Sequence, residues 1–227
     1  MFNIYCTKGN AEIYPCVLAQ TNTFQNYIYN VDVRTEYKNN SNNVLKEAYK
    51  GYTRRGKPFP FSSDKSGVFA CLTLLTELPV LKAAFFVSNR IFCYGSISAD
   101  PIFFENVGYS VEYVEPHESL PSKFFLNKLF IDDNIKNSEF YQKVNSVLEE
   151  KTIQEYALYA LFNVNKFRES FDFYGINLSI GYYNYKTANE YVVLEDVEKG
   201  IKMGREMIES LGYKKYYKKY KPLRILG

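Results

Sequence analysis

A continuous apolar segment at 68–78, followed directly by Pro79, constrains the fold more than any other feature of the sequence. The residues before it, 62–64, are Ser-Ser-Asp, and short polar side chains of this kind cap the first free N–H groups of a helix. Proline disfavours helical backbone in the residue that precedes it. We therefore predict a helix over 65–78. Because this helix is apolar on nearly all sides, we expect it to be central and buried.

Short runs of β-forming residues lie on both sides of this helix. Between 107 and 115 the residues alternate between two faces, with Tyr109 and Tyr113 on one and Ser110 and Glu112 on the other, which predicts a half-buried strand. Further strands are expected at 2–7, 11–20, 27–33, 84–87, 90–94, 176–183 and 191–194. Short polar turns predict that 2–7 pairs with 11–20, and 84–87 with 90–94, as hairpins.

Helices are predicted for much of the remaining chain, above all for residues 121–173. An Asn/Ser cluster precedes a short helix over 44–52, and Ser138 caps another, followed by an apolar segment at 153–162. A last helix over 197–211 ends at Gly212. These elements predict a single α+β domain over 1–211, with a mixed or mainly antiparallel sheet packed against several helices. A basic C-terminal segment follows over 212–227.

Charge is distributed unevenly along the chain. The whole chain has 28 Lys and Arg against 25 Asp and Glu, a formal net charge of +3. Residues 212–227 contain six cations and no Asp or Glu, so the positive net charge comes from this tail. Segregated charge of this kind is informative about binding partners rather than about the fold.

The tail combines its lysines with regularly spaced tyrosines. If it is helical, Tyr213, Tyr216, Tyr217 and Tyr220 share one face, with lysines around the rest. Lysines that neutralise phosphates and tyrosines that stack on bases are typical of nucleic-acid binding. A tail docked by its tyrosines on its own domain explains the same pattern, and an acidic protein or a membrane surface is a third alternative.

A second basic segment precedes the apolar helix. Arg54, Arg55, Lys57 and Lys65 are four cations within twelve residues, and they lead to a predicted helix N-terminus. Free N–H groups at a helix N-terminus bind anions, and arginine can grip a phosphate with two parallel hydrogen bonds. The alternative is a solvated loop followed by an ordinary helix cap. The candidate phosphate or nucleic-acid contacts are Arg54, Arg55, Lys57, Lys65, Tyr213, Lys214, Lys215, Tyr217, Lys218 and Lys219.

These segments predict a nucleic-acid-binding or nucleic-acid-processing protein, acting on DNA or RNA. Abundant residues of AT-rich codons suggest a bacterium or its phage, or a mobile element, as the source. A second hypothesis is a small-molecule transferase that holds a nucleotide or acyl-CoA at the helix starting near Lys65. A third is a protein-interaction or assembly component. The sequence does not decide whether the chain is an enzyme, and it assigns no catalytic residue and no cofactor.

Weaker patterns were also considered for catalysis. Acidic residues and the single histidine gather at Glu112, Glu115, His117 and Glu118, with two further acids at 132–133. They could bind a divalent metal or act as acid and base, or they could simply be surface residues. The Ser62 and Lys65 pair fits a nucleophile spacing, and residues 32–38 contain a carboxylate and lysine pattern of nucleases, but both are short enough to arise by chance. We assign no metal site, because one histidine does not provide for a His-based centre.

The cysteines and the apolar windows bear on location. Cys6, Cys16, Cys71 and Cys93 lie far apart and predict reduced thiols rather than disulfides or a zinc site. No signal peptide is recognisable at the N-terminus. The most apolar window, 68–87, is interrupted by charged residues and a proline, so we predict no membrane partner and a cytoplasmic location. The oligomeric state is left open.

Overall fold

The computed structural model describes residues 3–21, 32–39, 44–59, 63–87, 94–114, 125–127, 138–148, 154–156, 170–184 and 187–216. A seven-stranded sheet, sheet A, lies at its centre in the order β1-β6-β2-β7-β10-β8-β9. Its strands are β1 (Ile4–Lys8), β2 (Tyr14–Gln20), β6 (Leu81–Phe86), β7 (Val107–Val114), β8 (Phe125–Asn127), β9 (Gln154–Tyr156) and β10 (Tyr174–Ser179). Strands β6, β2, β7 and β10 run parallel, whereas β1 and β8 run antiparallel to β6 and β10.

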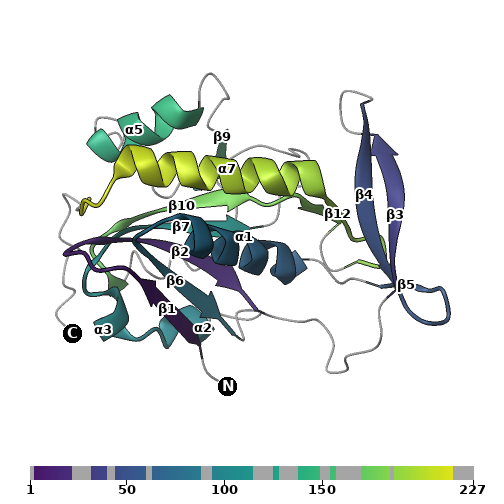
Figure 1. Cartoon of the computed structure of the whole chain (residues 1–227), viewed down its shortest axis with the longest axis horizontal. Coiled ribbons are helices and arrows are strands. Elements are labelled where there is room, and N and C mark those ends of the chain that lie inside the picture. The colour runs from purple at the N-terminus through teal and green to yellow at the C-terminus, as the bar shows by residue number, and fades with distance from the viewer. Residues whose placement is uncertain are drawn as a thin grey trace.

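Helices cover both faces of sheet A (Figure 1). One face carries α1 (Ser63–Glu77), α5 (Glu139–Leu148) and α7 (Leu194–Leu211), and the other carries the short α2 (Tyr94–Ile97) and α3 (Pro101–Phe104). We call the first the helix-covered face and the second the opposite face. A mixed sheet packed against several helices confirms the predicted α+β class.

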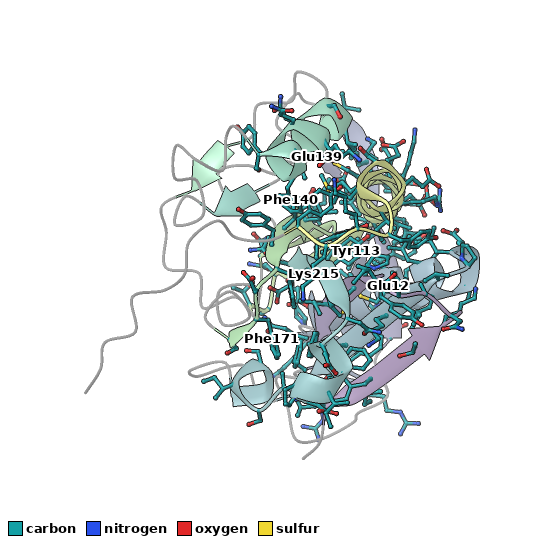
Figure 2. All side chains as sticks on the ribbon, turned by 90° about the vertical axis from the view of Figure 1, so that its left-hand side faces the viewer. Glu12, Tyr113, Glu139, Phe140, Phe171 and Lys215 are labelled. Atoms are coloured by element: carbon teal, nitrogen blue, oxygen red, sulfur yellow. The ribbon has the colours of Figure 1, made fainter. Side chains whose placement is uncertain are left out.

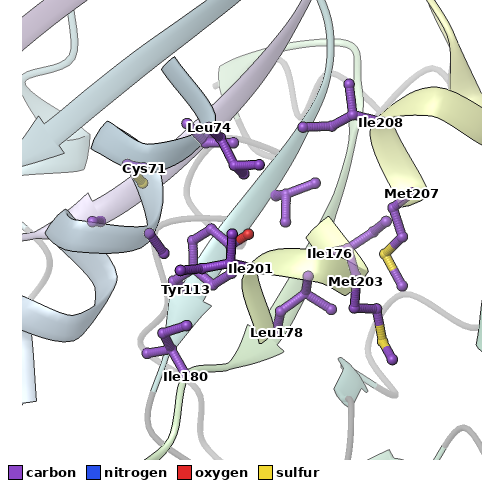
Figure 3. Close-up of a cluster of buried hydrophobic side chains, with 14 of the residues drawn as sticks. Cys71, Leu74, Tyr113, Ile176, Leu178, Ile180, Ile201, Met203, Met207 and Ile208 are labelled. Carbon is purple, nitrogen blue, oxygen red and sulfur yellow. The ribbon is translucent and has the colours of Figure 1, made fainter. Parts of the chain in front are cut away.

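The main core lies between sheet A and the helix-covered face. Every second residue of the inner strands points toward the helices, as the pleat requires. These residues are apolar and buried, and they include Val17, Ala83, Val111, Tyr113, Ile176 and Leu178. Tyr113 lies between α1 and α7 (Figure 3), and its ring approaches α7 so closely that a side chain at Gly204 would collide with its hydroxyl. Glycine is retained inside this helix, despite its conformational cost, because the sheet and the helix meet there.

A smaller aromatic cluster lies on the opposite face. Phe104 of α3 stacks on Phe86 of β6 and on Phe173, with ring centroids 6.4 Å and 6.3 Å apart. Figure 2 shows Phe171 on this side of the sheet and Phe140 of α5 on the other. The cluster covers the β6 and β2 half of the opposite face with apolar side chains, including Leu18 and Ala84.

A second sheet, sheet B, stands beside the main body (Figure 1). It contains β3 (Asp32–Asn39), β4 (Leu45–Tyr52), β11 (Tyr182–Tyr183) and β12 (Tyr191–Val193) in the order β11-β12-β4-β3, and β5 (Pro58–Phe59) pairs with β4. Strands β3 to β5 follow β2 and lead into α1, whereas β11 and β12 follow β10 and lead into α7. Both insertions therefore leave sheet A at the carboxyl end of a parallel strand.

Three local predictions are wrong, each because pairing distant in sequence overrides local signals. Segments 2–7 and 11–20 form no hairpin, because β1 and β2 both pair with β6, one on each side of it. Residues 44–52 form strand β4 rather than a helix, since they pair with both β3 and β12. Strand β6 likewise pairs with β1 and β2 rather than with a following strand, and Tyr94 opens α2.

Other predictions agree with the structure. Helix α1 starts and stops within two residues of the predicted bounds, and Gly212 ends α7 with a positive φ of 67°. Ser138 caps α5 by accepting a hydrogen bond from the Tyr141 N–H at 3.1 Å. Most of the segments predicted at 27–33, 90–94 and 153–162 lies outside the described residues. Within the block 121–173 predicted to be mainly helical, residues 125–127 and 154–156 form strands β8 and β9 instead, because they pair with each other and β8 with β10. Among the helices described, none has the length and hydropathy needed to cross a bilayer.

Candidate functional site

The connections of sheet A diverge between the neighbouring strands β2 and β7. From β2 the chain passes through sheet B and α1 to β6, on one side of the pair, and from β7 it continues to β10, on the other side. In open α/β sheets, ligands bind beyond the carboxyl ends of the strands at such a switch point. Both insertions that build sheet B also start at this edge. A ligand site is therefore expected at this edge of sheet A.

Polar side chains line the opposite face of β7 and β10 near this edge. Ser110 and Glu112 of β7 have none of their surface exposed, and Asn177 and Ser179 of β10 are only 2% and 5% exposed. Glu112 and Asn177 are direct neighbours in the parallel register. These residues alternate along the strands with the apolar residues that face the helices. We refer to Ser110, Glu112, Asn177 and Ser179 as the polar cluster.

Two atoms of the polar cluster have no hydrogen-bond partner within the described part of the chain. They are Ser110 Oγ and Asn177 Oδ1, and both are fully shielded from solvent. A buried polar atom without a partner costs about 1–3 kcal/mol, and nearly all such atoms in native proteins are paired with protein, water or a ligand. Glu112 follows Ser110 by two residues on β7 and pairs with Asn177 in the register, and its side chain is fully buried, which is rare for a glutamate. The cluster therefore has hydrogen-bonding capacity that the described residues leave unused.

The thiol of Cys16, which lies beside the polar cluster, is held in its neutral form. Cys16 of β2 is adjacent to Ser110 in the register, and its burial raises the pKa of the thiol far above its usual value despite the nearby Lys82. Cys71 on α1 is buried as well, and burial raises its pKa also. Thiols held in the neutral form are poor nucleophiles. The chemistry of this site therefore depends on the oxygen-bearing side chains.

The amino group of Lys82 is engaged by α3 and by the residues that follow this helix. Its Nζ donates to the Phe103 carbonyl and to Asn106 Oδ1, both at 2.5 Å, and it lies 4.5 Å from the centre of the Phe103 ring. Burial lowers the pKa of this lysine. The side chain thus ties α3 to β6, and the polar cluster remains rich in hydrogen-bond acceptors.

Sheet B is anchored to the body by a buried ion pair at the start of α7. Lys46 of β4 approaches Asp196 at 2.5 Å, and Tyr183 of β11 donates to the second oxygen of the same carboxylate at 2.6 Å. Burial is the largest single influence and would lower the pKa of Lys46, but the hydrogen bond to Asp196 and the negative charges of Asp196 and Glu195 together outweigh it, so the pKa is raised. One carboxylate therefore holds both insertions of sheet B against α7.

The basic residues predicted before α1 lie on two elements, three on one turn and one on α1. Arg54, Arg55 and Lys57 lie exposed on the tight turn between β4 and β5, closed by a 2.8 Å bond from the Gly56 N–H to the Thr53 carbonyl. Lys65 is exposed in the first turn of α1. Turn geometry accounts for Gly56, whose φ is 72°.

The tail does not begin as a helix. Residues 213–216 are irregular, and Tyr216 is buried, with its N–H on the Gly108 carbonyl at 3.2 Å and its hydroxyl on the Leu211 carbonyl at 2.7 Å. Lys214 forms an ion pair with Glu139 of α5. Tyr213 is half exposed and Lys215 is partly buried.

The chain crosses β7 closely at this point, because a side chain at Gly108 would collide with the backbone of Lys214. The described part of the tail is thus docked on its own domain, the alternative to nucleic-acid binding. Tyr217, Lys218 and Lys219 lie outside the described residues, as does the rest of the tail.

Of the acidic group predicted around the single histidine, the structure describes Glu112. It is buried in sheet A rather than at a surface strand end. Glu115, His117, Glu118 and the acids at 132–133 lie outside the described residues, as does Ser62. No three His, Cys, Asp or Glu side chains within the described residues are grouped to hold a metal ion.

Sequence reasoning did not select Ser110 and Asn177 for the site. Alternation along 107–115 did separate Ser110 and Glu112 from the apolar residues, but it assigned them to a solvent-facing side. Both faces of a parallel sheet are covered, so polar residues on a central strand are buried. Their polar atoms then need hydrogen-bond partners.

Comparison with known proteins identifies the fold. No family model matches the sequence, and no curated protein matches it. Among solved structures, aminopeptidase PepT from Bacillus cereus matches with a TM-score of 0.65 at 9% identity, over 92% of this chain and 84% of that chain. An aminopeptidase from the archaeon Desulfurococcus kamchatkensis matches with a TM-score of 0.52 at 9% identity, over 91% and 82%. The TET1 peptidase of Pyrococcus horikoshii matches with a TM-score of 0.51 at 13% identity, over 93% and 87%.

The chain shares the fold of these solved structures. The predicted nucleic-acid-binding function is therefore wrong, and so is the transferase alternative, since the matching folds are those of peptidases. The tail that carried the first prediction packs on its own chain in its described part. The fold equally gives no support for an association with phage. At these identities the likeness establishes the architecture, and the activity has to be argued from the site.

Proposed function

We propose that this protein binds peptides, and that it holds a peptide's free amino terminus at the polar cluster. The observation that carries the proposal is that two buried oxygen atoms, Ser110 Oγ and Asn177 Oδ1, have no hydrogen-bond partner within the described residues and lie next to the buried Glu112. They lie by the switch point of a fold that is shared with aminopeptidases. Support from the fold and support from the site thus point to the same substrate class.

The chemistry of the cluster favours a cationic group. An ammonium group donates three hydrogen bonds, and Glu112, Ser110 Oγ and Asn177 Oδ1 can each accept one. A hydrogen bond between an ammonium group and a carboxylate is among the stronger ones that proteins form. A phosphate would instead face the carboxylate of Glu112, which repels it because both groups are negatively charged. The same residues therefore disfavour nucleotides and acyl-CoA at this site.

The fold also supports a second candidate, hydrolysis of the bound peptide. Within the cluster, Glu112 is the residue that could act as a general base, because a carboxylate can take a proton from an attacking water molecule. Incubating the protein with short peptides, with and without added divalent ions, and analysing the products by mass spectrometry tests this directly. Release of amino-terminal residues that stops in Glu112→Gln would support hydrolysis, whereas intact peptides would leave binding as the function.

Binding can be tested with matched peptides. At about a hundredfold excess over Kd, a peptide with a free amino terminus should raise the melting temperature by roughly 5–10 °C, and its N-acetylated form should not. Glu112→Gln should remove the shift, because an uncharged amide no longer pairs with an ammonium group. Arg55→Ala, on the exposed β4–β5 turn, serves as the matched control and should keep it. An equal shift with the acetylated peptide, or none with any peptide, would refute the proposal.

A reducing cytoplasmic location accords with this function. The described cysteines, Cys6, Cys16 and Cys71, are all free thiols. Free, buried thiols are usual in reducing compartments. Fractionation of cells that express the tagged protein would test this, and recovery in an extracellular fraction would contradict it.

A further inference from the structure

We propose that two copies of this chain associate by pairing the outer edges of β3, antiparallel, about a two-fold axis at Thr35. The two hairpins of β3 and β4 would then form one continuous sheet. The proposal concerns sheet B and does not depend on the function proposed for the polar cluster.

Strand β3 offers a long open edge. It is the last strand of sheet B, and among the described residues only β4 pairs with it. Figure 1 shows the hairpin standing beside the body with β3 on its outer side. Edge strands expose a row of unpaired N–H and C=O groups, and proteins commonly protect them with prolines, bulges or short lengths. Strand β3 has eight residues, no proline, and an unbroken register with β4.

Symmetry restricts how two such edges can pair. In a continuous antiparallel sheet the two-fold axis is perpendicular to the sheet, so directly opposite side chains lie on the same face of both copies. An axis at Thr35 places Asp32 opposite Lys38 and Arg34 opposite Glu36, each twice. All charged residues of the strand then face an opposite charge, which stabilises cross-strand pairs.

Neighbouring registers are unfavourable. An axis at Arg34 places that arginine opposite itself and Asp32 opposite Glu36. An axis at Glu36 places that glutamate opposite itself and Arg34 opposite Lys38. Like charges directly opposite each other destabilise a sheet. The charge sequence of β3 thus favours one register over those on either side of it.

The other face of β3 gains apolar contact in the same register. Val33 and Tyr37 are 49% and 64% exposed, and the axis at Thr35 places each opposite the other in the partner copy. Pairs of an aromatic and a β-branched residue are among the more stabilising cross-strand pairs. The charged residues are already positioned, with Arg34 bonded to Asp32 at 2.9 Å and Lys38 to Glu36 at 2.6 Å within the strand. Their partial exposure allows them to reach a second strand as well.

A charge-swap experiment tests both the interface and its register. Sedimentation velocity of the full chain should show a dimer for the wild type. Arg34→Glu alone should be monomeric because two glutamates then face two glutamates, and Glu36→Arg alone should be monomeric because arginines face arginines. Mixing the two single variants should restore a dimer, since every pair across the axis is then of opposite charge. The double variant R34E/E36R should dimerise by itself.

Controls separate this result from misfolding. Arg55→Glu makes the same charge change on the exposed β4–β5 turn and should remain dimeric. Far-UV circular dichroism should show all variants folded. Thr35→Cys should form a disulfide across the axis on oxidation, and Val33→Cys should not. A wild type that stays monomeric at high concentration, single variants that still dimerise, or a mixture that stays monomeric would each overturn the proposal.

Discussion

The two faces of strand β7 differ in what their residues contribute. On the helix-covered face, Tyr109, Val111 and Tyr113 are buried against apolar neighbours from α1 and α7. On the opposite face, Ser110 and Glu112 are buried just as completely but carry polar groups, and the Ser110 hydroxyl has no hydrogen-bond partner within the described residues. The side chains on the two faces are therefore buried to the same degree, but those on one face are apolar and those on the other are polar. The comparison indicates that one face supplies stability, whereas the other gives up stability to keep a polar site.

The largest expected effect comes from the helix-covered face of β10. Leu178→Ala removes a fully buried side chain from the core cluster shown in Figure 3. We expect it to lower the free energy of unfolding by about 2–5 kcal/mol, through lost burial and the cavity left behind. Chemical denaturation measures this. Leu45→Ala, at a position that is 62% exposed, is the control and should change stability by less than about 0.5 kcal/mol. If both variants lowered the free energy of unfolding by the same amount, the assignment of Leu178 to the core and Leu45 to the surface would be contradicted.

The next prediction has the opposite sign and concerns the opposite face. Ser110→Ala removes a buried hydroxyl group that has no described partner. Its removal should raise the free energy of unfolding, by about 1 kcal/mol, because the cost of burying an unpaired polar atom disappears. The same variant should bind a free-amine peptide more weakly. A loss of stability would show that the hydroxyl is already satisfied in the free protein, and the comparison of the two faces would fail.

The described part of the tail adds Tyr216 to the core on the helix-covered face, and a substitution of this residue tests that contribution. Its ring packs against Tyr109 and Phe140, with centroids 5.9 Å and 5.3 Å away, and its hydroxyl bonds to the Leu211 carbonyl. Tyr216→Phe keeps the ring and loses the hydrogen bond, so we expect a loss of about 1 kcal/mol. Thermal denaturation measures this. No change would mean that the hydroxyl is bonded to water rather than to the end of α7.

The smallest effect is a pH dependence of tail docking. The bond from Lys214 holds the pKa of Glu139 below its usual value. A carboxyl group with a lowered folded-state pKa stabilises the fold above its unfolded pKa of about 4.3, and the contribution is lost as the pH falls through the folded pKa. Proteolytic cleavage near 214 should therefore become faster below about pH 4. In Glu139→Gln the tail should be cleaved at the same rate on both sides of this pH, and a retained pH dependence would assign it to another group.

Local signals predicted those parts of the fold that local chemistry determines. Each of the correct predictions depends on a few neighbouring residues. They are the capping residues and apolar run of α1, the amphipathic spacing of α7 with its terminal Gly212, and the Ser138 cap of α5. Strand β4 could not be predicted in this way. Its residues are compatible with a helix, and pairing with β3 and β12, far apart in the chain, decides their conformation.

The site was harder to predict than the fold. The alternation that separated Glu112 from its apolar neighbours was visible, but its burial follows from the parallel strands on either side of β7. Asn177 becomes its neighbour only through that pairing. For the tail, the tyrosine spacing led to a wrong prediction of local structure. It matched a helix, whereas Gly212 turns the chain and Gly108 lets the tail cross β7 in an irregular conformation.

The most direct test of the account is a crystal structure of the protein with a short peptide that has a free amino terminus. The account predicts the terminal nitrogen at the polar cluster, within hydrogen-bonding distance, about 2.7–3.2 Å, of the Glu112 carboxylate and of Asn177 Oδ1. The N-acetylated peptide should leave this position empty of peptide. A peptide bound elsewhere, or a cluster filled by ordered water while the peptide is bound, would contradict the assignment of these residues to peptide recognition.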